Sequence, residues 1–177
     1  MNIDTYFCKN KCCKIYIKPY KHPDNFNISY KSNYRKAGVF IFDPIQNRVL
    51  LVQSRGHLFG PPKGTLNIDE PDHIGAIREV KEETGIDIYF EDFQKSINIR
   101  NRAIYYYLEM PVCKIKVQDT IKDNDANGIT WIKLDCLEQE IIDGNIVLNH
   151  HAKIVFLKLL NKKFPKSDWT IVKYKKK

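Results

Sequence analysis

Residues 64–86 read GTLNIDEPDHIGAIREVKEETGI, and this stretch decides the architecture of the whole chain. Residues 71–84 are predicted to form a helix. Pro71 suits the first helical position, and the acidic residues around it suit the positive end of the helix dipole. Gly85 suits the position where a helix ends in a left-handed conformation. The sequence therefore predicts a helix that is entered from a glycine-bearing loop.

Three glutamates gather at the C-terminal end of this helix. Glu79, Glu82 and Glu83 are three and four residues apart, so they share one helix face. Adjacent carboxylates repel one another, and the negative end of the helix dipole disfavours them. A bound Mg²⁺ or Mn²⁺ ion, which prefers oxygen ligands, would relieve this repulsion, whereas the alternative is a solvated acidic face. The residues predicted to face the core are Ile74, Ile77 and Val80.

The spacing of the residues in this stretch carries a more specific signal. It follows the pattern G-x5-E-x7-R-E-U-x-E-E-x-G-U, in which U is aliphatic, and resembles the box of the Nudix hydrolases. All nine specified positions match: Gly64, Glu70, Arg78, Glu79, Val80, Glu82, Glu83, Gly85 and Ile86. The resemblance implies an α/β (α+β) fold, an α/β/α sandwich with a mixed sheet and a loop–helix–loop motif. It also implies metal-dependent hydrolysis of a nucleoside diphosphate linked to another group.

The resemblance assigns the chemistry to particular residues. Glu79, Glu82 and Glu83 correspond to ligands of Mg²⁺ or Mn²⁺, and the carbonyl of Lys63 or Gly64 adds a ligand. The ions would neutralise the diphosphate and lower the pKa of a bound water. Glu83 or Glu79 is expected to be the catalytic base that takes the proton from that water.

Two further roles follow from the same resemblance. Arg78 and Glu70 are expected to form a structural pair that braces the loop against the helix. Asp125 lies six residues before Trp131 and is expected near the metal. Asp123 is the alternative metal ligand, and a further alternative is an Asx-rich turn that binds no metal.

The entry to the helix favours two classes of substrate. Residues 59–64 read FGPPKG, which is similar to the entry in messenger-RNA decapping enzymes and in diadenosine tetraphosphate hydrolases. A net charge of +8 favours an RNA body with many phosphates. We therefore expect hydrolysis of the RNA 5′ cap, with diadenosine polyphosphates and diphosphoinositol polyphosphates as alternatives. A non-catalytic RNA-binding module is disfavoured because every acidic position of the box is intact.

Substrate contacts are expected from basic residues and one histidine around this loop, each with solvated surface as its alternative. These residues are Lys63, Arg55, His57, Arg35 and Lys36. Two of the three tyrosines at 105–107 share a strand face and are expected to pack in the core. His150 and His151 are expected to be structural or to face solvent.

Length and composition indicate the number of domains and the cellular compartment. The 177 residues, 43% of them hydrophobic, suffice for one domain. We expect a basic extension over residues 1–34 that packs on the domain, a Nudix domain over 35–165 and a lysine-rich tail over 166–177. The sequence shows neither a membrane-spanning run nor a signal-like stretch, so a cytoplasmic protein is expected, in the host cytoplasm if the Lys-, Asn- and Ile-rich composition reflects a viral genome. The five cysteines, an odd number, are expected to be free thiols. A metal site at Cys8, Cys12 and Cys13 is the less favoured alternative, because no second pair at zinc-finger spacing accompanies them.

Hydrophobic patterning predicts the remaining elements. Residues 54–64, with three glycines and two prolines, are predicted to form a loop. A closing helix is predicted over residues 149–160. Strands are predicted over residues 14–20, 37–42, 48–53, 86–90, 97–99, 103–110 and 129–134.

Overall fold

The computed structural model describes residues 3–19, 34–54, 57–118 and 126–164. Its strands are β1 (Asp4–Phe7), β2 (Lys14–Ile17), β3 (Lys36–Asp43), β4 (Arg48–Ser54), β5 (Leu58–Gly60), β6 (Lys63–Thr65), β7 (Lys95–Ile99), β8 (Ala103–Glu109), β9 (Ala126–Lys133) and β10 (Val147–Leu148). Its helices are α1 (Asp72–Thr84), α2 (Leu134–Ile142) and α3 (His150–Leu160), and η1 (Phe90–Asp92) is a 3₁₀ turn. Within these described ranges, no helix has the length and apolar composition that crossing a membrane requires.

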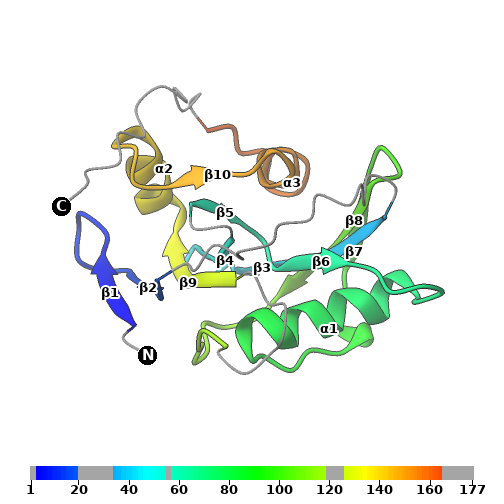
Figure 1. Ribbon diagram of the computed structural model, residues 1–177. Helices are drawn as coiled ribbons and strands as arrows, with labels where there is room; N and C mark the ends of the chain where they lie inside the picture. Colours follow the sequence, from blue (N-terminus) through cyan, green and yellow to red (C-terminus); the bar gives the residue numbers. More distant parts are fainter. Residues whose placement is uncertain (1–2, 20–33, 55–56, 119–125, 165–177) are drawn as a thin grey trace.

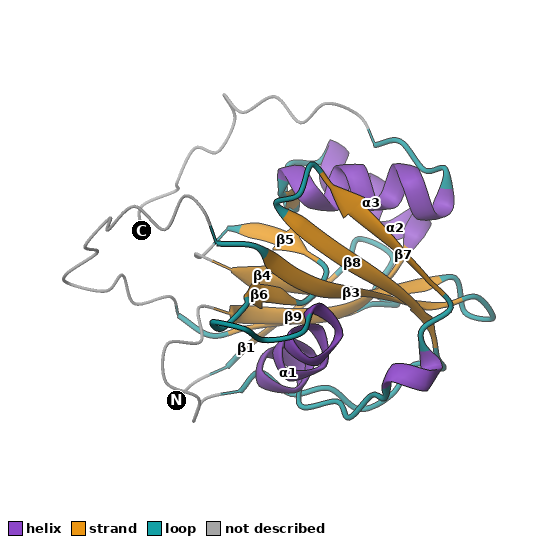
Figure 2. Cartoon of the chain, turned by 90° about the vertical axis from the view of Figure 1, so that its right-hand side faces the viewer, coloured by secondary structure: helices purple, strands orange, loops and turns teal. Residues whose placement is uncertain are grey.

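The strands form one mixed sheet between two helical layers. The strand order is β1-β2-β9-β4-β3-β8-β7, and β3 runs parallel to β8 while the other neighbours along this path are antiparallel. At the sides of this path, β6 pairs with β3, and β5 joins β4 to β10. Helix α1 covers one face, and α2 and α3 cover the other (Figures 1 and 2). The α/β/α sandwich and its mixed sheet are thus confirmed.

The core has two parts because both faces of the sheet are covered. Strand β3 divides its side chains between them: Val39 and Ile41 point to the α1 side, and Phe40 and Phe42 point to the side of α2 and α3. This alternation follows from the two-residue period of a strand. A strand buried on both faces is nearly all apolar, which explains the run AGVFIF at residues 37–42.

Helix α1 ends at the predicted residue, but its buried face differs from the predicted one. Gly85 adopts the left-handed conformation with φ 78°, and its N–H donates to the carbonyl of Lys81 at 2.9 Å. The prediction that Ile74 faces the core is wrong, because this side chain is 48% exposed while Val80 is fully buried. Each three-residue step falls about 60° short of a full turn, so Ile74 lies about 120° around the helix from Val80. Pro71 is the N-cap residue rather than the first helical one.

The other predicted elements divide into confirmed and wrong ones. The strand predicted over residues 86–90 is wrong: Ile86 and Ile88 are buried against the α1 side of the core, but the segment forms no strand and leads into η1. The loop predicted over residues 54–64 contains β5 and most of β6, which are too short to show a period. Helix α2 was not predicted. The elements confirmed with small shifts of their ends are the strands at 14–20, 37–42, 48–53, 97–99, 103–110 and 129–134 and the helix at 149–160.

Candidate active site

The candidate site lies where β6 leads into the loop before α1. Gly64 pairs with Ala37 of β3, and this pairing holds its backbone against the helix. A Cβ atom added to Gly64 would lie 2.0 Å from the carboxylate of Glu79. The carboxylate therefore occupies a space that only glycine leaves open at this position.

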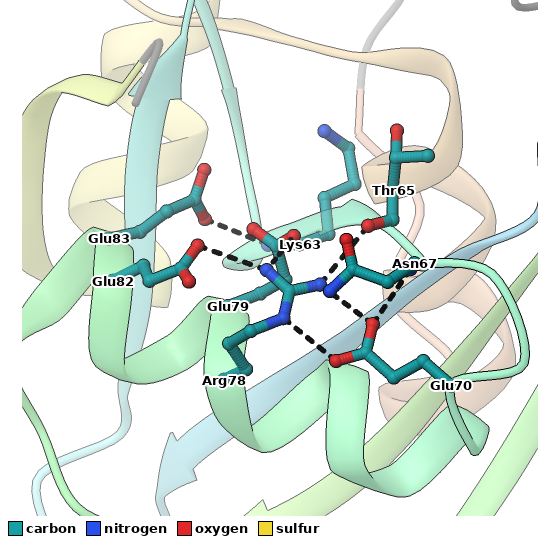
Figure 3. A network of polar contacts seen from close by, with 8 residues as sticks. All are labelled: Lys63, Thr65, Asn67, Glu70, Arg78, Glu79, Glu82 and Glu83. Carbon is teal, nitrogen blue, oxygen red and sulfur yellow. Dashed lines mark hydrogen bonds and ion pairs between the residues drawn. The ribbon is translucent and has the colours of Figure 1, made fainter. Parts of the chain in front are cut away.

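Arg78 is the centre of a polar network (Figure 3). Its Nε and Nη2 atoms donate to the two carboxylate oxygens of Glu70 at 2.8 and 2.9 Å. Its Nη1 atom donates to Glu79 at 2.8 Å and to Glu82 at 3.0 Å. Nη2 also reaches the carbonyl of Thr65 on β6 at 3.1 Å. The guanidinium, whose fixed fork suits two-point contact with carboxylates, therefore ties loop and helix together.

These contacts offset part of the carboxylate repulsion that the sequence predicts. Arg78 was expected to pair with Glu70, and it also contacts Glu79 and Glu82 and offsets the repulsion between them. Among the eight residues drawn in Figure 3, four carry carboxylates, and Arg78 and Lys63 carry cationic side chains. Within this drawn group, negative charges therefore outnumber positive ones.

Glu83 occupies the most protected position in the network. Its side chain is 4% exposed and accepts a hydrogen bond from the backbone N–H of Lys63 at 2.8 Å. Burial raises the pKa of Glu79, and the charge of Arg78 opposes that shift. Carboxylate oxygens are the ligands that Mg²⁺ and Mn²⁺ prefer. The donor set of Glu79, Glu82 and Glu83 therefore fits a hard divalent cation.

The pair of Glu70 and Arg78 makes acid stability testable. Hydrogen bonds from Arg78 lower the pKa of Glu70 from its usual 4.5 to about 2. Because the folded-state pKa is the lower one, the pair stabilises the fold above pH 4.5, and this contribution is lost as the pH falls through about 2. Glu70→Gln is therefore expected to flatten the loss of stability over this window, as measured by urea unfolding. The exposed Glu91→Gln is the control, and equal slopes in both variants would contradict the assignment.

A second group of side chains borders Glu83 on the α3 side. The hydroxyl of Tyr105 lies 3.4 Å from Nδ1 of His151, and burial, together with the charge of Glu83, raises the pKa of Tyr105. Burial lowers the pKa of His151, and nearby positive charges lower it further. We use the name basic cluster for Lys63, Lys36 and Arg102 with the neighbouring His150 and His151.

The sequence did not predict the link between Tyr105 and His151. The two residues are 46 positions apart and meet only because β8 and α3 come together in the fold. The prediction that two of the three tyrosines pack in the core is confirmed, because Tyr105 and Tyr107 are buried and Tyr106 is partly exposed. Trp131 is also a core residue, at 4% exposure.

The remaining predicted contacts are dispersed. Arg35 pairs with Asp72 at the first turn of α1 at 3.0 Å and with Asn98 of β7 at 2.8 Å, which places it at the opposite end of the helix from Glu83. Lys36 begins β3, opposite Thr65 of β6, and belongs to the basic cluster. His57 is exposed beside β5. The predicted residues Arg55, Asp123 and Asp125 lie outside the described residues.

Comparison with known proteins agrees with the family that the sequence resembles. Residues 33–171 match the family model described as NUDIX domain. Protein 111R of Invertebrate iridescent virus 3, which carries a hydrolase name, is 31% identical over 137 residues, 76% of this chain and 80% of that protein. The m7GpppN-mRNA hydrolase dcap-2 of Caenorhabditis elegans is 37% identical over 122 residues, 64% of this chain but only 15% of the worm protein.

A solved structure supports the same fold. The dihydroneopterin triphosphate pyrophosphohydrolase of E. coli superposes with a TM-score of 0.54 at 17% identity, covering 72% of this chain and 96% of that one. The chain belongs to the Nudix family and is a Nudix hydrolase. Nudix hydrolases generally need divalent metal ions, which agrees with the oxygen donors gathered on α1.

Proposed function

We propose that this chain is a Mg²⁺- or Mn²⁺-dependent pyrophosphohydrolase that cleaves the 5′ cap of RNA, releasing a guanosine diphosphate species and 5′-monophosphate RNA. The observation that carries the proposal is the position of Lys63 beside both the glutamates and other basic residues. Its backbone N–H donates to Glu83 of the polar network, and its strand β6 pairs with β3, which begins with Lys36. A polyphosphate that binds there would be attracted by the cluster and would bring its phosphates to the carboxylates.

The chain's own residues supply positioning and proton transfer. Bound divalent ions would neutralise the diphosphate and lower the pKa of a water. Glu79, Glu82 and Glu83 would hold these ions, while Arg78 keeps the first two carboxylates in place. Glu83 or Glu79 would take the proton of the attacking water. Glu83 is the better placed, because the N–H of Lys63 fixes one of its carboxylate oxygens.

Two lines of support favour capped RNA among the diphosphates. The worm relative of 37% identity bears the name of an mRNA cap hydrolase. The net charge of +8 suits a ligand with many phosphates beyond the cleaved bond, because each neutralised phosphate releases counterions. A small dinucleotide does not need so basic a protein.

Parallel assays test this proposal. The full chain would be incubated with Mg²⁺ or Mn²⁺ and cap-labelled RNA, diadenosine tetraphosphate or a diphosphoinositol polyphosphate. We expect release of a labelled guanosine diphosphate species from RNA, at a kcat/KM that exceeds those of the other two substrates and falls with salt. Faster cleavage of either small substrate would assign that substrate instead. Metal-independent RNA binding without turnover of any of the three would indicate a binding module.

A further inference from the structure

Four cysteines meet on the side of the sheet away from the glutamates. The connection between β1 and β2 reads CKNKCC over residues 8–13 and supplies Cys8, Cys12 and Cys13. The first turn of α2 supplies Cys136, and Figure 1 shows this connection beside α2. The four Sγ atoms all lie within 4.8 Å of one another. All four thiols are free, so none of them is held by a disulfide.

The spacing of these sulfurs is that of a tetrahedral metal site. The Sγ atom of Cys12 lies 3.4 Å from that of Cys136, 3.6 Å from that of Cys13 and 3.7 Å from that of Cys8. The Sγ atoms of Cys8 and Cys136 are 3.8 Å apart. Sulfurs about 2.3 Å from one zinc ion at tetrahedral corners lie about 3.8 Å apart. We propose that Cys8, Cys12, Cys13 and Cys136 bind one structural Zn²⁺ ion.

Hydrogen-bond donors contact three of the four sulfurs. The backbone N–H of Cys13 donates to Sγ of Cys8 at 3.3 Å, and that of Lys133 donates to Sγ of Cys13 at 3.4 Å. Nδ2 of Asn10 lies 3.8 Å from Sγ of Cys136, which also sits at the positive N-terminal turn of α2. Such outer contacts orient metal ligands and stabilise their charge. On coordination, each protonated thiol releases its proton to solvent.

The donor set selects the type of metal and its role. Four sulfurs at tetrahedral spacing are typical of zinc or of iron bound by sulfur. The short spacing encloses a single ion and leaves no room for the bridging sulfides of an iron–sulfur cluster. The nearby carboxylate of Glu140 accepts hydrogen bonds from the N–H of Lys9 and from Asn145, so it is already engaged. A site closed by four cysteines has no open position for a substrate, and its role is structural.

The hairpin formed by β1 and β2 gains most from such an ion. Each strand has four residues, and every residue of β1 is exposed. Strand β2 pairs with β9, but β1 pairs with β2 at the end of the sheet and buries little apolar surface. The ion would join its connection to α2, 124 residues further along the chain, and so fix both elements against β9.

Metal analysis of the full chain tests the site independently of hydrolysis. The protein would be expressed in zinc-containing medium and purified without chelators. Elemental mass spectrometry is then expected to find one zinc ion per chain. Cys12→Ser is the informative variant, because Cys12 is exposed and its replacement opens no cavity. Cys113→Ser is the matched control, since Cys113 lies outside the group. We expect zinc to fall to background in the first variant and to stay equimolar in the second.

Cobalt and thiol mapping complete the experiment. Replacement by Co²⁺ is expected to give the thiolate charge-transfer band and the strong visible bands of a tetrahedral thiolate site, and to lose them in Cys12→Ser. A chelator is expected to lower the thermal midpoint of the wild type and of Cys113→Ser but not that of Cys12→Ser. Absence of metal from the wild type, with the four thiols alkylated as free groups or recovered as disulfides, would overturn the proposal.

Discussion

Glu83→Gln is expected to lower kcat for hydrolysis about 10³-fold, the range that removal of a general base gives. Gln has nearly the shape of Glu, and its carbonyl oxygen can still accept the hydrogen bond that the N–H of Lys63 gives to Glu83. The fold should therefore persist while the negative charge and the proton acceptor are lost. Initial rates at saturating metal and substrate, with circular dichroism as a check on folding, measure the effect.

The control for this variant is Glu91→Gln, which removes one exposed negative charge in η1. It is expected to leave kcat unchanged. If Glu83→Gln retained more than about a tenth of the wild-type kcat, a role as the base would be excluded, because general bases contribute 10² or more. In that case Glu79→Gln would become the variant to compare, since Glu79 is the other candidate.

Gly64→Ala is expected to lower kcat about 10²-fold with little change in stability. The new methyl group would stand 2.0 Å from the Glu79 carboxylate, so the carboxylate must move. The end of a long side chain can move at low cost to the fold, but it would leave both its contact with Arg78 and its place beside the other glutamates. A displacement of about 1 Å in a catalytic arrangement costs about 10²-fold in rate.

Thr65→Ala is the matched control for this variant. It changes the next residue of β6 and keeps the backbone carbonyl that accepts from Arg78. It is expected to leave kcat within a factor of about two, since the described hydrogen bonds of Thr65 to the network run through its backbone. Both variants should unfold within about 1 kcal/mol of the wild type in urea. A Gly64→Ala protein that lost stability and kept its kcat would contradict the assignment.

The sequence predicted those parts of the fold that local patterns encode. The helix stop at Gly85 and the buried strand at residues 37–42 depend on residues adjacent in the chain, and both are confirmed. The face of α1 was misjudged because a three-residue spacing drifts around a helix, which left Ile74 exposed. Strands β5 and β6 have three residues each, too few for a period to be visible.

Local sequence patterns do not specify which distant segments come into contact. The nine box positions indicated the acidic side of the site, but the three-fold pairing of Arg78 depends on side-chain directions that spacing alone does not give. The pair of Tyr105 and His151 requires the docking of α3. In the same way, three cysteines near the N-terminus show no metal-binding pattern until α2 adds Cys136.

The hairpin of β1 and β2 also determines which strand ends the sheet. Strand β9 is buried along seven of its eight residues, and β2 pairs with its outer side. Without the hairpin, β9 would offer a row of unpaired backbone groups to other chains, the arrangement that promotes edge-to-edge aggregation. The short, exposed β1 takes that outer place instead, and β7, which carries Lys95, ends the opposite side. We therefore expect the hairpin to limit edge-to-edge aggregation of the domain.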